Sequence, residues 1–169
     1  LFAIGGNGSR GPHDFSKEAF VKECFAFDLT SQQVKRLADL PQPLQSGAGS
    51  LVAHNSEHQS IAVIGGLAFD EKKEGLGGLN SILLYDAKSN GWTRSDVTLP
   101  KQRAMFHGAT YDDAVWLFAG SSVGKGRKLA ETVLFWWGDE SDVRPLPNIA
   151  IPTPRRSFGG AKVGKEYFV

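Results

Sequence analysis

The chain has 169 residues, 41% of them hydrophobic and 22% charged, which is enough for one domain with a sizeable core. Its 19 basic and 18 acidic residues leave a formal net charge of +1, which excludes a general electrostatic attraction to nucleic acid or to an anionic membrane. No apolar run approaches the roughly 20 residues that cross a bilayer. The 20 glycines and 11 phenylalanines predict tight turns and β structure.

An apolar run that ends in a glycine pair recurs along the chain. Residues 1–6 (LFAIGG) open the sequence with it, and residues 61–66 (IAVIGG) repeat it. Residues 115–120 carry a third copy, with Ala119 in place of the first glycine, and residues 167–169 begin a fourth. We interpret each copy as the second strand of a repeating unit.

Two other landmarks follow these runs in a constant order. The first is an apolar segment that leads to an Asp, at 24–28 (CFAFD), at 82–86 (ILLYD) and, in a stretched form, at 133–139 (VLFWWGD). The second is a proline with a later glycine. These pairs are Pro41 with Gly49, Pro100 with Gly108 and Pro152 with Gly160; Arg103 and Arg155 lie inside the last two pairs, and Leu44 lies inside the first.

Each unit is predicted to contain four short strands. Turn-forming residues at 88–91 (KSNG) separate the last two strands of the middle unit. We find no convincing helix. For residues 16–24 (SKEAFVKEC), which lie between the second and third strands, we prefer a long loop over the alternative of one or two helical turns. The predicted strands of the middle unit are 49–53, 61–66, 82–85 and 91–95.

Together these landmarks resemble the kelch repeat. The spacing of about 50 residues fits kelch repeats better than shorter propeller repeats. The resemblance implies an all-β fold of kelch-type β-propeller blades, each a four-stranded antiparallel sheet, around a channel. The middle unit matches best, with Gly65-Gly66, Tyr85-Asp86, Trp92, Pro100 and Arg103 in the expected order.

The phase of the repeat makes the chain an open-ended kelch segment of about three repeats. We expect strands two to four of a blade at 1–46, a full blade at 47–99, another at 103–147 and the start of a further blade at 155–169. One interpretation, which we prefer, is a piece of a longer propeller. The other is half of a six-bladed propeller, in which two copies combine head to tail and the strand near Gly159 completes the other copy's opening blade.

Consecutive strands reverse direction, so the loop after each second strand and the linker before each first strand open on one side. We call this side the loop face. In kelch propellers, by resemblance, this face receives partners and the Arg before the first strand lines the channel mouth. The segments that it gathers are 7–20, 67–79, 121–131, 41–44, 100–103 and 152–155.

Basic side chains on the loop face suit a carboxylate, which arginine binds through bidentate hydrogen bonds. For most of these basic residues, the alternative to ligand binding is a purely structural role. Arg103 and Arg155 would then bond to backbone carbonyls of neighbouring blades, Lys125 would be solvated, and His107 would pack in the core. The candidate ligand-binding residues are Arg103, Arg155, Asn7, Arg10, His107 and Lys125.

Catalytic and metal chemistry finds little support in the sequence. Residues 54–58 (HNSEH) match a metalloprotease pattern that requires a helix, but they fall in a predicted turn. No catalytic Ser-His-Asp or Cys-His set can be assembled, so no metal, cofactor or catalytic residue is predicted, and the preference is against an enzyme. The single cysteine, Cys24, is predicted to be in the core; it mildly favours a reducing compartment, while periplasm and secretion stay open.

The leading hypothesis is a scaffold for protein–protein interactions. It would bind a protein or peptide segment, with acidic segments favoured, on the loop face at the channel mouth. The alternative is a carbohydrate-active or sugar-binding kelch propeller, similar to sialic acid epimerases, that recognises an acidic sugar; a third is a propeller that only spaces other domains. No nucleic-acid or membrane partner is expected, and either self-association or missing blades would close the ring.

Overall fold

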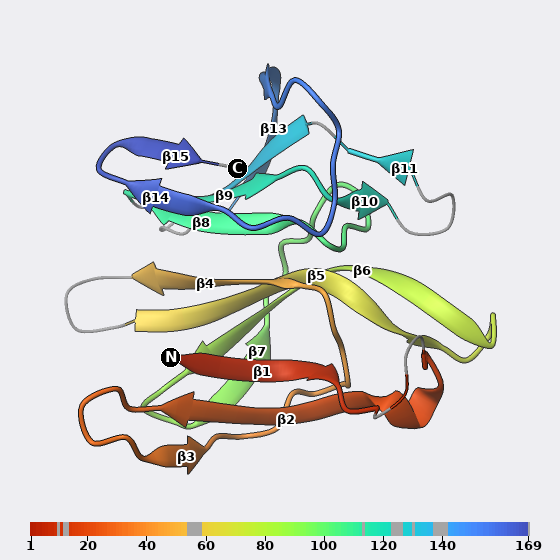
Figure 1. The fold of residues 1–169 in the computed structure, drawn as a ribbon, viewed down its shortest axis with the longest axis vertical. Coiled ribbons are helices and arrows are strands. Elements are labelled where there is room, and N and C mark those ends of the chain that lie inside the picture. Colours follow the sequence, from red (N-terminus) through yellow and green to blue (C-terminus); the bar gives the residue numbers. More distant parts are fainter. Residues whose placement is uncertain are drawn as a thin grey trace.

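The protein has an all-β fold built from stacked antiparallel sheets. The computed structural model describes residues 1–9, 11, 14–53, 59–112, 114–122, 127–129, 131–136 and 142–168. Three sheets follow one another along the long axis of the molecule, and a short hairpin lies beside the last of them (Figure 1). We call these sheets the first, second and third blade in chain order. No helix in the described part of the chain is long and apolar enough to span a membrane.

Each blade is a meander, because every strand pairs with the next strand of its blade. The first blade contains β1 (Phe2–Asn7), the 3₁₀ helix η1 (Lys17–Ala19), β2 (Phe20–Phe27) and β3 (Val34–Arg36). The second contains β4 (Ala48–Ala53), β5 (Gln59–Asp70), β6 (Gly75–Asp86) and β7 (Gly91–Arg94). The third contains β8 (His107–Tyr111), β9 (Ala114–Phe118), β12 (Glu131–Trp136) and β13 (Asp142–Ala150).

Two small hairpins complete the fold. One joins β10 (Ser121–Ser122) to β11 (Arg127–Lys128), and the other joins β14 (Ala161–Val163) to β15 (Glu166–Phe168). The pairing of β14 with β15 follows that of β8 with β9, since Val163 faces Glu166 as Tyr111 faces Ala114. The β14–β15 hairpin therefore has the arrangement of the first two strands of a blade.

Apolar side chains on alternate faces of the strands pack between the blades. On β5, Ile61 and Val63 belong to a cluster shared with Cys24 of the first blade. Their neighbours Ala62 and Ile64 belong to a second cluster, shared with Leu117 of the third blade. This period of two is the pattern of a strand that is buried on both sides. Cys24 is fully buried, as the sequence predicted.

The glycine pair marks the junction between each blade and the next. Gly5 and Gly65 adopt φ of 57° and 58°, and Ala119, which replaces the glycine in the third copy, adopts 54°. The residue after each of them donates its N–H to a carbonyl of the next linker, at 2.8 Å, 2.8 Å and 2.9 Å. Those three bonds are Gly6 to Leu44, Gly66 to Arg103 and Gly120 to Arg155.

A second series of backbone bonds connects consecutive linkers. Met105 donates its N–H to the carbonyl of Ser46 at 2.9 Å, and Ser157 donates to the carbonyl of Met105 at 2.9 Å. All three residues have positive φ, between 53° and 58°, which is uncommon outside glycine. The linkers are therefore joined to each other as well as to the blades.

The predicted Asp and Trp landmarks hold the outer strands. The Asp86 carboxylate accepts hydrogen bonds from the backbone N–H of Lys88 and Ser89, which closes the turn between β6 and β7. The indole of Trp92 donates to the carbonyl of Ala38 at 2.9 Å, so β7 is tied to the first blade. Asp86 and Trp92 therefore stabilise the arrangement of the strands.

Two predictions about loops were wrong. We expected residues 67–79 to form a long loop, but β5 and β6 continue through them as a hairpin whose pairing ends at Asp70 with Gly75. A register shift between Ile64 and Gly66 lets the strands continue past the junction. Likewise, part of 16–24 is strand, because β2 already begins at Phe20. Phe20 is buried in a small cluster with Leu67, against which Phe69 packs.

Candidate functional site

The loop face is defined by backbone bonds as well as by strand direction. At each glycine pair a second strand meets the linker that leads into the next first strand, and β5 continues past this point to Asp70. Isolated bridges between Gln45 and Leu67 and between Ala104 and Ser121 strengthen the same contact. The backbone at each glycine pair is therefore held beside a linker, whereas the predicted loop 67–79 is the strand hairpin described above.

Arg103 is buried beneath the loop face. Its side chain is only 2% exposed, and its guanidinium donates a hydrogen bond to the carbonyl of Ala119 at 2.9 Å. Its own N–H donates to Leu79 of the second blade at 3.0 Å. Arg103 thus connects the second blade to the third, which is the arrangement that the structural alternative described. A role in ligand binding stays a prediction for this residue.

Arg155 occupies the equivalent place at the next junction and is more accessible. Its side chain is half-buried, and its Nε donates to the carbonyl of Thr153 at 3.3 Å. Its own carbonyl accepts the N–H of Gly120. Arg103 and Arg155 therefore bond to neighbouring groups, the carbonyl of Ala119 and the N–H of Gly120, which belong to a single peptide unit.

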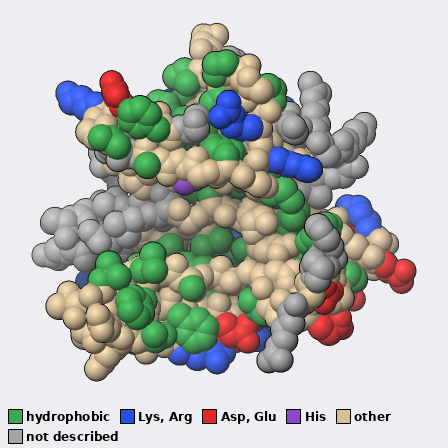
Figure 2. Space-filling view, in the orientation of Figure 1, with side chains coloured by type: hydrophobic (Ala, Val, Ile, Leu, Met, Phe, Trp, Pro, Cys, Tyr) green, Lys and Arg blue, Asp and Glu red, His purple; other side chains and the backbone are tan. Residues whose placement is uncertain are grey.

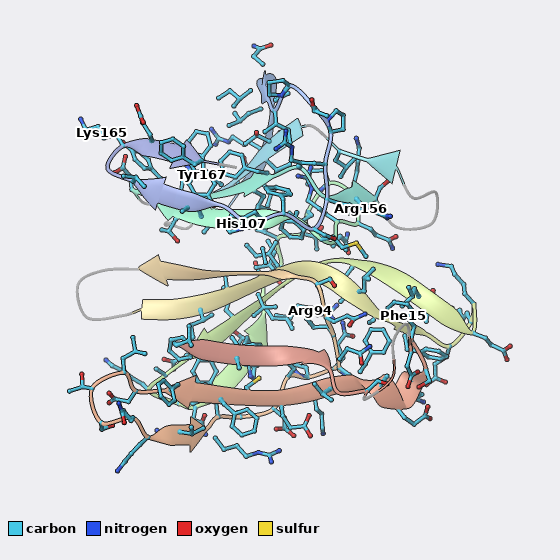
Figure 3. The ribbon with its side chains drawn as sticks, in the orientation of Figure 1. Phe15, Arg94, His107, Arg156, Lys165 and Tyr167 are labelled. Atoms are coloured by element: carbon cyan, nitrogen blue, oxygen red, sulfur yellow. The ribbon has the colours of Figure 1, made fainter. Side chains whose placement is uncertain are left out.

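Arg156 follows directly and is exposed; its basic side chain was expected on the loop face, although it was not among the candidate ligand-binding residues (Figure 3). The adjacent Ser157 has a φ of 53° and is fixed to Met105 by a backbone bond. A linker with two consecutive arginines is thus attached both to Gly120, which follows β9 of the third blade, and to Met105 of the preceding linker.

Asn7 shapes the loop of the first blade. Its amide donates to the carbonyl of Asp14 at 2.7 Å, and its oxygen accepts the N–H of Ser9 at 2.9 Å. The Asp14 carboxylate accepts the backbone N–H of Ser16, and this bond lowers the pKa of Asp14. Among the other predicted residues, Arg10, Lys125 and the 54–58 segment lie outside the described residues.

His107 lies between the third blade and the β14–β15 hairpin. Its ring packs against Tyr167, with centroids 5.6 Å apart, and against Phe158 at 6.2 Å (Figure 3). Burial lowers the pKa of His107, since the charged imidazolium would lose solvation there. These contacts correspond to the packing role that the sequence analysis kept as an alternative, and its role toward a ligand stays a prediction.

Acidic and basic side chains lie at the tip of the β5–β6 hairpin, in the segment 67–79 that was expected to be a loop on this face. At the β5–β6 tip, Lys73 pairs with Asp70 at 2.9 Å, and Glu71 pairs with Lys17 of η1 in the first blade. Acidic and basic side chains gather around this tip (Figure 2). Within the described residues, no group of three or more His, Cys, Asp or Glu side chains is arranged to hold a metal ion.

The four-stranded antiparallel meanders, joined at glycine pairs, define a kelch-type β-propeller whose ring is not closed. Over 170 residues the chain is 29% identical to Beta-scruin of Limulus polyphemus, and the match covers 100% of this chain but 17% of that protein. The structure is similar to that of YjhT, with a TM-score of 0.61 and 12% identity over 84% of this chain and 55% of that one. No family model matches the chain. The chain therefore spans about a sixth of Beta-scruin and about half of YjhT.

Proposed function

We propose that the protein is an interaction module that binds an acidic segment of a partner protein on its loop face. The carrying observation is the linker that presents Arg155 and Arg156 next to the Ala119–Gly120 peptide. Because this linker is held by backbone bonds, the backbone that carries both arginines is positioned before a partner arrives, which lowers the entropic cost of binding. Partner-binding residues commonly lie on loops that a rigid scaffold holds in place.

In this proposal the arginines at equivalent positions of the repeat have different tasks. The half-buried Arg155 and the exposed Arg156 provide positive charge for carboxylates, which arginine binds through paired hydrogen bonds. Arg103 is buried and supports the junction beneath them by holding the carbonyl of Ala119. Asn7 contributes by fixing the loop of the first blade, and Arg10 and Lys125 would extend the basic surface.

The experiment measures binding of a fluorescent library of Asp- and Glu-rich peptides by anisotropy. Replacing both Arg155 and Arg156 by alanine should weaken binding at least about tenfold, since hydrogen bonds to charged groups contribute about 1.5–3 kcal/mol each. The urea midpoint should not change. Arg94→Ala is the matched control, because it removes one exposed arginine from the outer strand β7.

Two results would contradict the proposal. One is equal loss of binding with Arg94→Ala, which would indicate nonspecific attraction to positive charge. The other is tighter binding of free sialic acid than of any acidic peptide, which would support the sugar-binding alternative, because the same guanidinium groups also suit a sugar carboxylate.

A further inference from the structure

An accessible hydroxyl lies in the linker 151–160, which connects β13 to β14. It belongs to Thr153, and this residue and its neighbours Pro152 and Pro154 are all exposed. The backbone bonds that hold this linker to its surroundings involve Arg155 and residues after it. Thr153 therefore lies on the surface, immediately before the part of the linker that is fixed.

The exposure of Thr153 is a property of its place in the repeat. Counting from the prolines Pro100 and Pro152, the equivalent residue of the preceding linker is Lys101. Lys101 is exposed as well, although the complete third blade follows the linker that carries it. A linker with a blade on each side therefore leaves this position accessible.

The sequence around Thr153 favours a protein kinase as the enzyme that acts on this hydroxyl. Pro154 is the only one of the eight prolines in the sequence that follows a serine or a threonine. Proline has no N–H, so it suits a kinase whose substrate pocket offers no hydrogen-bond acceptor to the residue after the target. Arg155 and Arg156 come next, and charge is a second feature by which kinases select their substrates.

Arg155 already contacts Thr153. Its Nε donates a hydrogen bond to the carbonyl oxygen of Thr153 at 3.3 Å, which is long for such a bond. A phosphate on the side chain of this threonine would carry three acceptor oxygens and about two negative charges. A guanidinium bonds more strongly to a phosphate than to a neutral carbonyl, because the bond is charge-assisted and can be paired. The exposed Arg156 offers a second guanidinium in the same linker.

We propose that Thr153 is a phosphorylation site and that Arg155 and Arg156 hold its phosphate. A kinase transfers the γ-phosphoryl group of ATP to the threonine. The bond between Oγ1 and the γ-phosphorus forms, the bond from that phosphorus to ADP breaks, and the hydroxyl proton passes to the catalytic base of the kinase. The linker then contains both the anion and the cations that bind it.

Phosphorylation closes the arginine site to acidic partners, a consequence that rests on the proposed function. The phosphate and the carboxylates of a partner require the same guanidinium groups. Because the phosphate is attached to the linker, it competes at an effective concentration on the order of millimolar or above. The unmodified chain therefore binds an acidic segment, and the phosphorylated chain releases it.

Peptide mapping by mass spectrometry tests the site itself, after the 169-residue chain is treated with ATP and a proline-directed kinase. The phosphate should be found on Thr153, and Thr153→Val should remove it. Pro154→Ala should slow its incorporation at least about tenfold. Pro152→Ala is the matched control, because it makes the same change on the other side of Thr153, and it should be phosphorylated at the parent rate.

Phosphorus NMR of the phosphorylated chain tests the contact with the arginines, and it needs no partner. The second pKa of the phosphothreonine should lie below its usual value of about 6, since nearby guanidinium groups stabilise the dianion. Replacing Arg155 and Arg156 by alanine should raise this pKa back toward that value. Arg94→Ala, on the outer strand β7, should leave it unchanged.

Anisotropy measurements with acidic peptides test the consequence for binding. Phosphorylation of the parent chain should raise the dissociation constant of the peptide at least about tenfold. The same kinase treatment of the Thr153→Val chain should leave the dissociation constant unchanged, because that chain has no hydroxyl to accept the phosphate.

Three outcomes would overturn the inference. One is the absence of phosphate from Thr153, including its appearance on Ser157 instead. The second is a phosphothreonine with an ordinary pKa, and the third is undiminished peptide binding by the phosphorylated chain. A failure of the proposed function is distinguishable, because the unmodified chain would then bind no acidic peptide while the mapping and the NMR titration still decide whether Thr153 is the site.

Discussion

The junction between the first and second blades and the junction between the second and third use the same backbone bond and different side chains. In one, Gly6 donates to the carbonyl of Leu44, and in the other Gly66 donates to the carbonyl of Arg103, both at 2.8 Å. Leu44 and Arg103 are each 2% exposed, but Leu44 packs in an apolar cluster whereas Arg103 bonds to the next blade. The backbone therefore sets the junction, and the side chain at this position adds a separate, replaceable interaction.

The largest effect is expected from a substitution that disturbs the backbone bond itself. Gly65→Ala places a Cβ 2.4 Å from the carbonyl oxygen of Arg103 at a φ of +58°, so it should lower the free energy of unfolding by about 3 kcal/mol or more. Urea denaturation followed by tryptophan fluorescence measures the change. Gly49→Ala is the control and should change stability by less than about 0.5 kcal/mol, since its Cβ is unobstructed. Equal effects of the two substitutions would contradict the account.

The second test exchanges the side chains of the two junctions. Arg103→Ala removes a buried guanidinium and leaves the Ala119 carbonyl without that donor, so stability should fall by about 2 kcal/mol. Arg103→Leu, which copies the first junction, should cost less because its side chain restores apolar packing. Thermal unfolding of both variants measures the difference. A leucine variant as unstable as the alanine variant would show that the guanidinium is indispensable.

The smallest expected effect concerns the third junction. There His107 occupies the position in the repeat that Ala48 occupies in the preceding blade. Burial lowers the pKa of His107 in the folded state, so the neutral ring is favoured there. Its contribution to stability is present above the unfolded pKa of about 6.5 and is lost as the pH falls from there toward the lower folded pKa. Urea midpoints measured between neutral and mildly acidic pH should show this loss, and His107→Ala, which copies Ala48, should reduce it. An unchanged pH dependence in that variant would refute the assignment.

The sequence predicted the blades because their landmarks are constraints on the backbone. Gly65 and Gly66 recur since a Cβ on either would come within 2.8 Å of a linker carbonyl, and Asp86 recurs since it closes a turn. Such constraints are local and leave a visible pattern. The fold class, the loop face and the buried Cys24 could therefore be predicted.

The features that were missed depend on contacts between distant segments. The β5–β6 extension is stabilised by Phe20 and Leu67, which are far apart in the sequence. The direction of the Arg103 side chain depends on the Ala119 carbonyl across the junction, and no repeat pattern shows which way a guanidinium points. The alternating apolar residues Leu67 and Phe69 were the sequence signal for the β5–β6 extension. The glycines that follow them suggested a loop and concealed this signal.

The backbone bonds between linkers affect how much the side chains of the linkers can vary. Ser46, Met105 and Ser157 join neighbouring linkers through main-chain N–H and carbonyl groups alone. A substitution that keeps the positive φ leaves these connections intact, whatever its side chain. Mutations can therefore accumulate on the loop face without moving one blade relative to the next. Evolutionary drift of the linker side chains, and with it new binding specificity, is thus compatible with a fixed architecture.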